Sequence, residues 1–462
     1  MAALDTYIVN VALPTIAHYF NVDTSDVALV TICYLLIITS TLPIFGKIGD
    51  RTGFKLIFIL GFATFTLGSF LSGFAPGIYL LVGARTIQGI GASMLYAVGM
   101  AMITRYIPAS SRGWAFGITS TMAGLGVVVG APLGGVITQY LNWNWIFWIN
   151  VPVGIAAIIV ALKVLPHEKR EPGGEKLPFD TAGAVMIFLG LVSLVFALNR
   201  GQKIGWAHWG ILCAFILAAL LLAGFVLWER KFKDPLIHPR LFKHPSFTFG
   251  SLACMLIWGT FAGGNFLLPF YLSLVRQLQT SLIGAAFLIS SIIFIIVSPL
   301  MGRLSDRTGP RVLACAGAAG GAAALLFFSF TLQVDSTIPT LVYLALIGLS
   351  MGSFVPTNNS VTLGSVPADN QGAASAASRA FQNLGMVLGV AIYQTVFSSV
   401  LPVSSMNTSP SGTGLPTDLL LTGFQYAFLA GVAMCAGGFI FSLFAREDRS
   451  AGPRGEPPPG ML

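Results

Sequence analysis

Residues 46–55 read GKIGDRTGFK and residues 302–311 read GRLSDRTGPR, so the same Gly, Asp, Arg, Thr and Gly recur in register 256 residues apart. Each copy lies between two apolar runs, after the second run of the chain and after the second run beyond Phe247. This placement predicts a duplicated unit of six membrane helices. Parallel repeats of this kind place a binding site between the two halves, near the middle of the bilayer.

The composition indicates a membrane protein. Hydrophobic residues make up 55% of the 462 residues, charged residues make up 9%, and the mean hydropathy is +0.81. A soluble domain carries far more charge. About fourteen apolar runs of roughly 18 to 28 residues can each cross the roughly 30 Å hydrocarbon core as a helix. We therefore expect an all-α polytopic membrane protein with two six-helix bundles and two inserted helices.

This organisation divides the chain into four parts. They are an N-terminal six-helix bundle, a linker with two inserted transmembrane helices, a C-terminal six-helix bundle and a disordered cytoplasmic tail. In this order they cover residues 1–165, 166–246, 247–445 and 446–462. The tail contains GPRGEPPPG, a composition typical of disordered segments.

The net charge of +8 fits membrane topology better than nucleic-acid binding, because the basic residues are spread over short loops. If the N-terminus is cytoplasmic, 20 of the 25 Lys and Arg residues lie on the cytoplasmic side, and only Arg200, Lys203 and Arg276 lie outside. We expect a multi-pass protein of the cell (inner or plasma) membrane with both termini in the cytoplasm. The five cysteines all lie in apolar runs, so neither a disulfide nor a metal site is expected.

The first run, with LDTYIVNVALP at 4–14, places an acid close to the start of the chain. As a helix, it would hold Asp5 only about 6 Å from Met1, at 1.5 Å per residue. The run lacks the basic segment of a cleavable signal peptide. A native start upstream of Met1 is therefore an open expectation.

Three charged residues lie deep in apolar runs, namely Asp5, Arg85 and Arg379. A charge at the bilayer centre costs about 2.5 to 3.5 kcal/mol on insertion scales, so such residues are paired or face water. Asp5 and Arg85 form the natural pair, and making or breaking their contact could switch the carboxyl between proton-holding and proton-releasing states. The alternative is a static pair that orients two helices. Arg379 could instead extend its guanidinium to the membrane interface.

Five stretches together resemble the major facilitator superfamily, and within it the fourteen-helix drug/proton antiporter branch of the EmrB/QacA type. The stretches are LDTYIVNVALP (4–14), GKIGDRTGFK (46–55), LVGARTIQGIGAS (81–93), GLGVVVGAPLGG (124–135) and WNWIFWINVPVG (143–154). The chain departs from the branch pattern in three places, with Ala131 before Pro132, Tyr7 in place of a threonine, and Asn144 in place of an arginine. These departures concern substrate preference more than fold.

The resemblance implies roles for three sets of residues. It implies a proton relay through Arg85, alongside Asp5. It implies a conformational gate at the repeated loops, with Gly46, Asp50, Arg51, Gly53, Lys55, Asp306 and Arg307. The alternative for the basic gate residues is simple anchoring at the cytoplasmic surface. It also implies an antiporter motif that limits proton leak, with Gly126, Gly130, Pro132, Gly134 and Gly135. Small residues at helical spacing in any case permit close helix packing in lipid.

For the substrate cavity we select polar and aromatic residues on helices that would line the interface of the halves. They are Tyr7, Asn10, Tyr34, Trp258, Phe261 and Asn265. The aromatic ones could stack on flat lipophilic or cationic compounds, although core packing is the alternative for each of them. The run at 282–300 contains no acid, which argues against doubly charged cations.

These features together predict a proton-coupled multidrug efflux antiporter for lipophilic, cationic or neutral compounds, working by alternating access. The expected partners are small-molecule substrates, protons and the lipid bilayer, and a periplasmic adaptor stays an open question. No cofactor is expected, because the proton gradient supplies the energy and the sequence has no ATP-binding motif. The alternatives are a proton-coupled transporter of a specific metabolite, a membrane-embedded enzyme and a passive channel.

Overall fold

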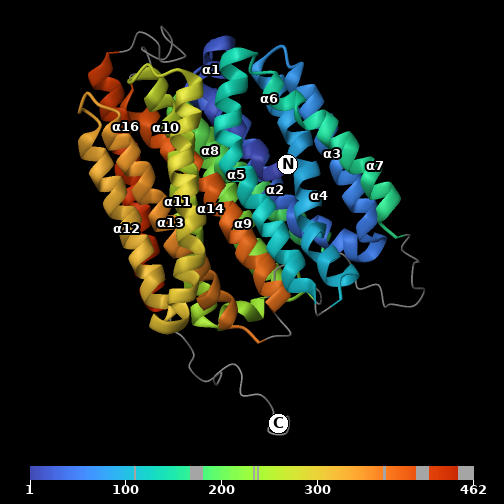
Figure 1. The fold of residues 1–462 in the computed structure, drawn as a ribbon. Helices are drawn as coiled ribbons and strands as arrows, with labels where there is room; N and C mark the ends of the chain where they lie inside the picture. Colours follow the sequence, from blue (N-terminus) through green and yellow to red (C-terminus); the bar gives the residue numbers. More distant parts are fainter. Residues whose placement is uncertain are drawn as a thin grey trace.

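The computed structural model describes residues 1–108, 111–166, 180–232, 235–236, 239–367, 371–401 and 416–445. Within these residues every regular element is a helix, and the helices stand side by side along one common direction (Figure 1). Their bounds are α1 Ala2–Phe20, α2 Thr24–Thr52, α3 Phe54–Gly73, α4 Ile78–Tyr106, α5 Arg112–Tyr140, α6 Trp145–Trp148, α7 Asn150–Val164, α8 Thr181–Ile204, α9 Trp209–Glu229, η2 Pro239–Lys243, α10 Pro245–Leu274, α11 Thr280–Thr308, α12 Pro310–Thr331, α13 Ile338–Gly364, α14 Gln371–Val400 and α16 Thr417–Phe444. The predicted all-α membrane fold is confirmed.

Thirteen stretches of the described chain are long and apolar enough to cross a membrane. The short α6 and α7 form one of them, at Trp145–Val164. Helix α1 is not among the thirteen, because Asp5, Asn10 and His18 lower the hydropathy of its 19 residues. It is nevertheless enclosed by other helices, and ten of its residues, including Asp5, are buried.

The helices pack in two groups. In the first, α3 packs on α4 and α7, α2 on α4, and α1 on α5. In the second, α10 packs on α14 and α16, and α12 and α11 both pack on α13. The groups meet where α5 lies against α11, α2 against α14, and α1 against α10. Each group therefore contributes three helices to the surface at which a site between them can form.

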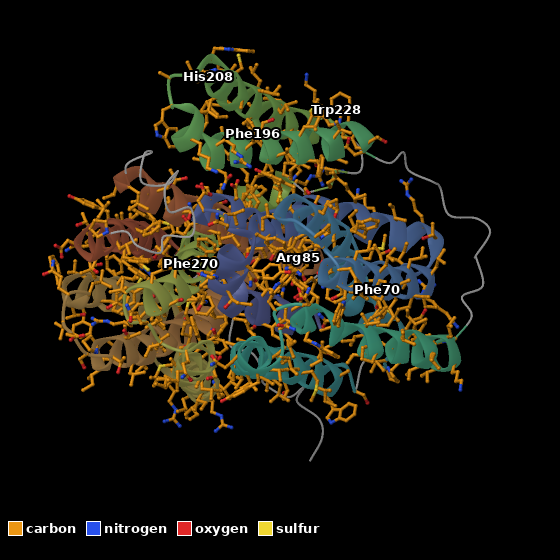
Figure 2. All side chains as sticks on the ribbon, turned by 90° about the horizontal axis from the view of Figure 1, so that it is seen from above. Phe70, Arg85, Phe196, His208, Trp228 and Phe270 are labelled. Carbon is orange, nitrogen blue, oxygen red and sulfur yellow. The ribbon has the colours of Figure 1, made fainter. Side chains whose placement is uncertain are left out.

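Helices α8 and α9 form a separate pair. In Figure 2 they lie as a layer beside the other helices, carrying the labelled Phe196, His208 and Trp228. Helix α8 contacts both α2 and α14, one from each group. The inserted pair thus adjoins the line along which the two groups meet.

The repeated sequence does not form the loop that we expected. Helix α2 continues to Thr52 and α11 to Thr308, and each ends at a glycine with positive φ, 100° at Gly53 and 87° at Gly309. The amide of Gly53 donates to Gly49 O at 2.9 Å, and Gly309 makes the equivalent bond to Ser305 O at 3.0 Å. Glycine adopts this conformation without steric cost, so both copies act as helix stops.

Successive helices run in opposite directions, so the helix ends gather at two ends of the molecule. We call the end that carries the α1–α2 turn the Asp23 end, which is uppermost in Figure 1. We call the opposite end, where α2 and α11 stop, the Gly53 end. These two names are used below to place each cluster of side chains.

Candidate functional site

Asp5 and Arg85 meet in the interior of the first helix group, as the sequence predicted. Arg85 Nη1 lies 2.5 Å from Asp5 Oδ2, and the two side chains are 1% and 0% exposed. The pair joins α1 to α4, which do not adjoin in the sequence. Figure 2 shows Arg85 in the middle of this group of helices, far from its outer surface.

Two amide side chains complete the shell around the carboxylate. Gln88 Nε2 donates to Asp5 Oδ1 at 2.9 Å, and Asn150 Nδ2 donates to the same oxygen at 3.1 Å. Arg85 Nη1 also donates to Gln88 Oε1 at 2.6 Å. Both carboxylate oxygens of Asp5 therefore accept hydrogen bonds from buried donors.

Ser69 of α3 connects these amides to the backbone. Its Oγ accepts from Gln88 and from Asn150, both at 3.2 Å, and donates to Phe147 O at 2.8 Å. The network thus ties together α1, α3, α4, α6 and α7. We call the set Asp5, Ser69, Arg85, Gln88 and Asn150 the buried network.

Tyr34, predicted as a cavity residue, packs on the guanidinium of Arg85. The Arg85 Cζ lies 3.9 Å from the centre of the Tyr34 ring and 5.7 Å from that of Phe147. A cation over an aromatic face is stabilised by the ring quadrupole, more strongly when water is excluded. Tyr34 is fully buried, so it holds the arginine in place from the α2 side.

A pocket opens between the two helix groups, beside the buried network. The non-atom space within it is about 270 Å³, including space open to the surroundings. Its lining comes from α1, α2, α10 and α14 and comprises Thr6, Tyr7, Asn10, Thr31, Leu35, Phe261, Ala262, Asn265, Met386 and Val390.

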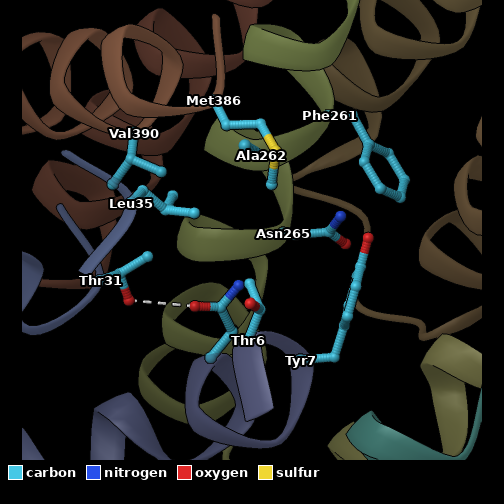
Figure 3. A pocket seen from close by; sticks show the side chains of 10 residues that line it. Thr6, Tyr7, Thr31, Leu35, Phe261, Ala262, Asn265, Met386 and Val390 are labelled. Carbon is cyan, nitrogen blue, oxygen red and sulfur yellow. Dashed lines mark hydrogen bonds between the residues drawn. The ribbon is translucent and has the colours of Figure 1, made fainter. Parts of the chain in front are cut away.

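Four of the six predicted cavity residues line this pocket, namely Tyr7, Asn10, Phe261 and Asn265. Figure 3 shows Leu35 and Val390 on one side of it, and Phe261, Asn265 and Tyr7 on the other. Asn10 Oδ1 accepts a hydrogen bond from Thr31 Oγ1 at 3.1 Å. Trp258 does not line it and instead meets Phe261 edge-on, with ring centres 5.8 Å apart.

Helix α1 carries side chains of both sites. Asp5 points to α4 and the buried network, whereas the next residues, Thr6 and Tyr7, line the pocket. At 1.5 Å rise per residue these groups lie within one helical turn of each other. A small rotation or shift of α1 would therefore change both sites at once.

The glycines of the predicted antiporter motif bring α5 close to two neighbours. A Cβ on Gly130 would lie 2.9 Å from Leu4 O, and one on Gly134 would lie 2.5 Å from Ile8 O, so both face α1. A Cβ on Gly135 would lie 2.5 Å from Thr280 O of α11, in the other helix group. Small residues are required at both surfaces. Gly126 also faces α1, where its Cβ would lie 3.2 Å from Leu4 N.

Pro132 lies on the surface that α5 shares with α11. A Cβ on Gly284 of α11 would lie 2.5 Å from Ala131 O and 3.1 Å from Pro132 Cα. The motif therefore seals the two helix groups together toward the Asp23 end.

The predicted gate residues lie at the Gly53 end. Lys55 Nζ donates to Leu162 O at 3.3 Å and to Leu165 O at 2.5 Å. It therefore caps the C-terminal end of α7 instead of binding a carboxylate. Gly46 has open space around its Cα, and the Arg307 side chain is exposed. The side chains of Asp50 and Asp306 lie outside the part of the structure that is described, and a gate role for these residues and for Arg51 stays a prediction.

A second set of polar contacts, which the sequence did not predict, lies at the Asp23 end. Lys203 Nζ lies 2.7 Å from Asp23 Oδ2 and 2.9 Å from Asp26 Oδ2, and Arg200 Nη1 lies 2.8 Å from Asp26 Oδ1. These pairs join α8 to the start of α2. Burial lowers the pKa of Lys203, but its hydrogen bonds to Asp23 and Asp26 and their charges outweigh this, so the pKa is raised overall. We call these four residues the surface cluster.

Beside the surface cluster, α14 is tied to α2 and α8. Gln394 Nε2 donates to Thr24 Oγ1 at 3.0 Å and to Ser25 Oγ at 2.9 Å, and Thr395 Oγ1 donates to Leu198 O at 3.0 Å. These bonds link the two helix groups to each other and to the inserted pair. The two helix groups are therefore in contact at the Asp23 end.

Residues 1–390 match the family described as the Major Facilitator Superfamily. The chain belongs to this superfamily. Its fold agrees with that of a solved structure described as a bacterial homolog to human lysosomal transporter, Spinster, in an inward-facing and unoccupied conformation. That structure aligns with a TM-score of 0.66 and 16% identity over 96% of this chain and 94% of the other.

Curated relatives in the Major Facilitator Superfamily cover most of the chain. The riboflavin transporter RibZ of Clostridioides difficile is 31% identical over 97% of this chain and 96% of its own length. The puromycin resistance protein pur8 of Streptomyces alboniger is 30% identical over 96% and 87%. The multidrug transporter protein MdtP of Bacillus subtilis is 31% identical over 86% and 73%. These matches indicate a multi-pass membrane transporter and not an enzyme.

Three residues of the buried network, Ser69, Gln88 and Asn150, were missed by the sequence analysis. Gln88 and Asn150 both occur inside stretches quoted for the superfamily resemblance, LVGARTIQGIGAS and WNWIFWINVPVG. An uncharged amide in an apolar run needs a hydrogen-bond partner in the same way that a charge needs one. A search for such amides, in addition to charged residues, would have found both.

Proposed function

We propose that this chain is a drug/proton antiporter of the fourteen-helix EmrB/QacA-type branch, which exports small lipophilic compounds by alternating access. The observation that carries the proposal is the position of Asp5. It is a fully buried acid held by Arg85, Gln88 and Asn150, on the same helix whose next residues line the pocket between the two helix groups. The proton gradient is the energy source, and no cofactor is required.

The coupling step follows from the donors around Asp5. Three donors, from Arg85, Gln88 and Asn150, occupy the carboxylate oxygens, so a proton can reach Asp5 only when some of these contacts are broken. Protonation removes the charge that holds Arg85 against α1. Helix α1 is then free to shift relative to α4, which changes the pocket lining at Thr6, Tyr7 and Asn10. Proton binding and substrate binding thereby exclude each other.

Alternating access is supported by the difference between the two ends. The Asp23 end is closed by the α5 and α11 glycine contacts and by the bonds from Gln394 to α2. Most Lys and Arg residues lie toward the Gly53 end, so the positive-inside rule places this end in the cytoplasm. In this orientation the structure is the state that is closed to the outside and ready to load a compound from the cell membrane or cytoplasm.

A proton-coupled transporter of one specific metabolite is the second candidate. It is supported by RibZ, whose match covers nearly the full length of both chains. The two candidates share the coupling chemistry at Asp5 and differ only in the range of compounds carried.

The test is transport into everted membrane vesicles with and without an imposed proton gradient. The compounds are ethidium, riboflavin and a panel of uncharged fluorescent drugs, and wild type is compared with Asp5→Asn. We expect wild type to accumulate several unrelated compounds only with the gradient, and the Asp5→Asn variant to lose this accumulation while still exchanging bound compound across the membrane. The gradient supplies the driving force, of which the membrane potential contributes about 2.3 kcal/mol per charge per 100 mV.

Two outcomes would change the proposal. Gradient-driven transport that persists in Asp5→Asn would make Asp5 structural and would remove the coupling mechanism. Transport of riboflavin alone would instead support the second candidate. A size-exclusion profile of the purified Asp5→Asn variant that matches wild type controls for misfolding.

A further inference from the structure

Arg379 lies on the face of α14 that leads into the pocket. Met386 and Val390 line the pocket, and they follow Arg379 by 7 and 11 residues. At 3.6 residues per turn these three positions share one side of the helix, with Arg379 roughly 10 Å nearer to the Gly53 end than Met386. The Arg379 side chain is exposed. Its position indicates that it faces the space between the helix groups.

Residues on the opposite walls support this placement. Arg379 is within electrostatic range of Tyr96 of α4, in the first helix group, and of Cys254 of α10. Tyr96 is 42% exposed and is also within electrostatic range of Asp5. A guanidinium within electrostatic range of residues on both α4 and α10 lies on the side of α14 that faces these helices.

An aromatic wall continues from Arg379 to the pocket. On α10, Cys254, Trp258, Phe261 and Asn265 recur at spacings of four, three and four residues, which places them on one face of the helix. Phe261 and Asn265 line the pocket, and Trp258 meets Phe261 edge-on. Tyr7 lies opposite, with its ring centre 6.5 Å from that of Phe261. A flat molecule could therefore lie along this face, between Arg379 and the pocket.

The charge presented to such a molecule is positive. None of the ten residues that line the pocket is charged. Asp5 is fully buried, and Arg85 balances its charge. Among the residues that the structure describes, no carboxylate pairs with Arg379. The acid that could attract a cation is thus covered, whereas a basic group is open.

We propose that Arg379 is a substrate-binding residue that selects planar aromatic compounds with an acidic group, a carboxylate or a phenolate, over compounds with a positive charge. The inference rests on the proposed transport function and names its substrate class. A guanidinium binds a carboxylate through two parallel hydrogen bonds, and it repels a cation at the same position. This differs from the expectation of cationic substrates, because that expectation rested on aromatic side chains alone.

The test uses two dyes that share one ring system and differ in charge. Fluorescein is an anion with a carboxylate and a phenolate, and rhodamine 123 is a cation built on the same xanthene core. Binding to the purified protein in nanodiscs of neutral lipid is measured by fluorescence polarisation, and transport is measured in proteoliposomes with an imposed proton gradient. The variants are Arg379→Gln and Arg379→Lys. The control is Arg303→Gln, which removes another exposed arginine, on α11.

We expect wild type to bind fluorescein more tightly than rhodamine 123. Arg379→Gln should weaken fluorescein binding about tenfold, the scale of a lost charge-assisted hydrogen bond, and leave rhodamine 123 binding unchanged or stronger. Arg379→Lys should restore part of the fluorescein affinity, and Arg303→Gln should resemble wild type. The change in transport should appear in KM and not in kcat.

Three results would overturn the proposal. One is equal weakening of both dyes by Arg379→Gln, which would mean a structural role. Another is tighter binding of rhodamine 123 than of fluorescein by wild type. The third is an effect of Arg379→Gln that occurs only with anionic lipid in the nanodisc, which would mean that the arginine binds lipid head groups. Because dye binding needs no proton gradient, a failure of proton coupling would show in the transport assay alone.

Discussion

The buried network and the surface cluster use the same chemistry in two different settings. In the buried network, Asp5 and Arg85 are 0% and 1% exposed, and each carboxylate oxygen has a donor from a neighbouring helix. In the surface cluster, Lys203 is 29% exposed and shares Asp26 with Arg200. The ion pair of the buried network is excluded from water, so no water molecule can replace a lost partner. In the surface cluster, water and a second cation can replace a lost partner of Asp26.

This difference suits the buried network to proton coupling and the surface cluster to opening and closing of the Asp23 end. A buried ion pair contributes little net stability compared with apolar packing, but breaking one partner leaves an uncompensated charge. Such a pair responds strongly to a single proton, which is what coupling requires. The pairs of the surface cluster are partly exposed, with Lys203 at 29% and Asp26 at 12%, so salt screens them more than it screens the buried pair. They suit a contact that must open and close repeatedly, as the Asp23 end must during alternating access.

The largest expected effect comes from removing the arginine of the buried network. Arg85→Met should destabilise the protein by about 3 to 5 kcal/mol, because Asp5 would remain charged or would have to bind a proton in the interior. The measurement is thermal unfolding of the purified protein in detergent. The double variant Asp5→Asn, Arg85→Met should be more stable than Arg85→Met, since it buries no charge.

If Arg85→Met and the double variant unfold at the same temperature, the two residues do not act as a pair. The contrast between the two clusters would then be lost. A leucine exchanged on the exposed face of α9, Leu220→Met, serves as the control for a general effect of substitution within the membrane helices, because Leu220 is 66% exposed.

The Asp5–Arg85 contact could be predicted from the sequence, whereas its surroundings could not. Only three charged residues lie deep in apolar runs, and among them Asp5 and Arg85 have opposite signs within one half of the chain. Charge alone therefore selects the pair. The neutral Ser69 gives no such signal. The amide of Asn150 signals that it needs a hydrogen-bond partner but does not identify that partner, which depends on how α7 is rotated about its own axis.

The same limit explains why the sequence did not place Tyr34 against Arg85. The polar residues Thr31, Thr39 and Ser40 of α2 point in different directions around the helix, so the sequence does not show which face meets the pocket and which meets α4. The hydrogen bond between Thr31 Oγ1 and Asn10 Oδ1 could not be predicted for the same reason. Only the packing of α1 on α2 brings these two atoms to 3.1 Å. Helix positions follow from hydropathy, whereas helix rotations require the packed structure.

The second prediction measures how much the amides contribute to the buried network. Asn150→Leu removes one donor from Asp5 Oδ1 and one from Ser69 Oγ, so we expect a loss of about 1 to 3 kcal/mol, smaller than for Arg85→Met. Thermal unfolding is the measurement, and Asn144→Leu is the comparison, since Asn144 donates to the backbone oxygen of Gly73 outside the network. A variant Asn150→Leu as stable as wild type would show that Gln88 and Arg85 alone satisfy the carboxylate.

The smallest effect is expected at the surface cluster. Lys203→Met should lower stability by at most about 1 kcal/mol, because Arg200 still pairs with Asp26 and the site is partly exposed. The raised pKa of Lys203 means that Asp23 and Asp26 stabilise its charged form in the folded state. Its contribution should be complete at pH 8 and should be lost as the pH rises above about 10.5, through the pKa of the folded state. The difference in unfolding temperature between wild type and Lys203→Met should therefore shrink at pH 11.5, and also in 1 M salt at pH 8.

A difference in unfolding temperature that stays constant under both changes would show that Lys203 acts through packing. The surface cluster would then resemble the buried network in its insensitivity to solvent.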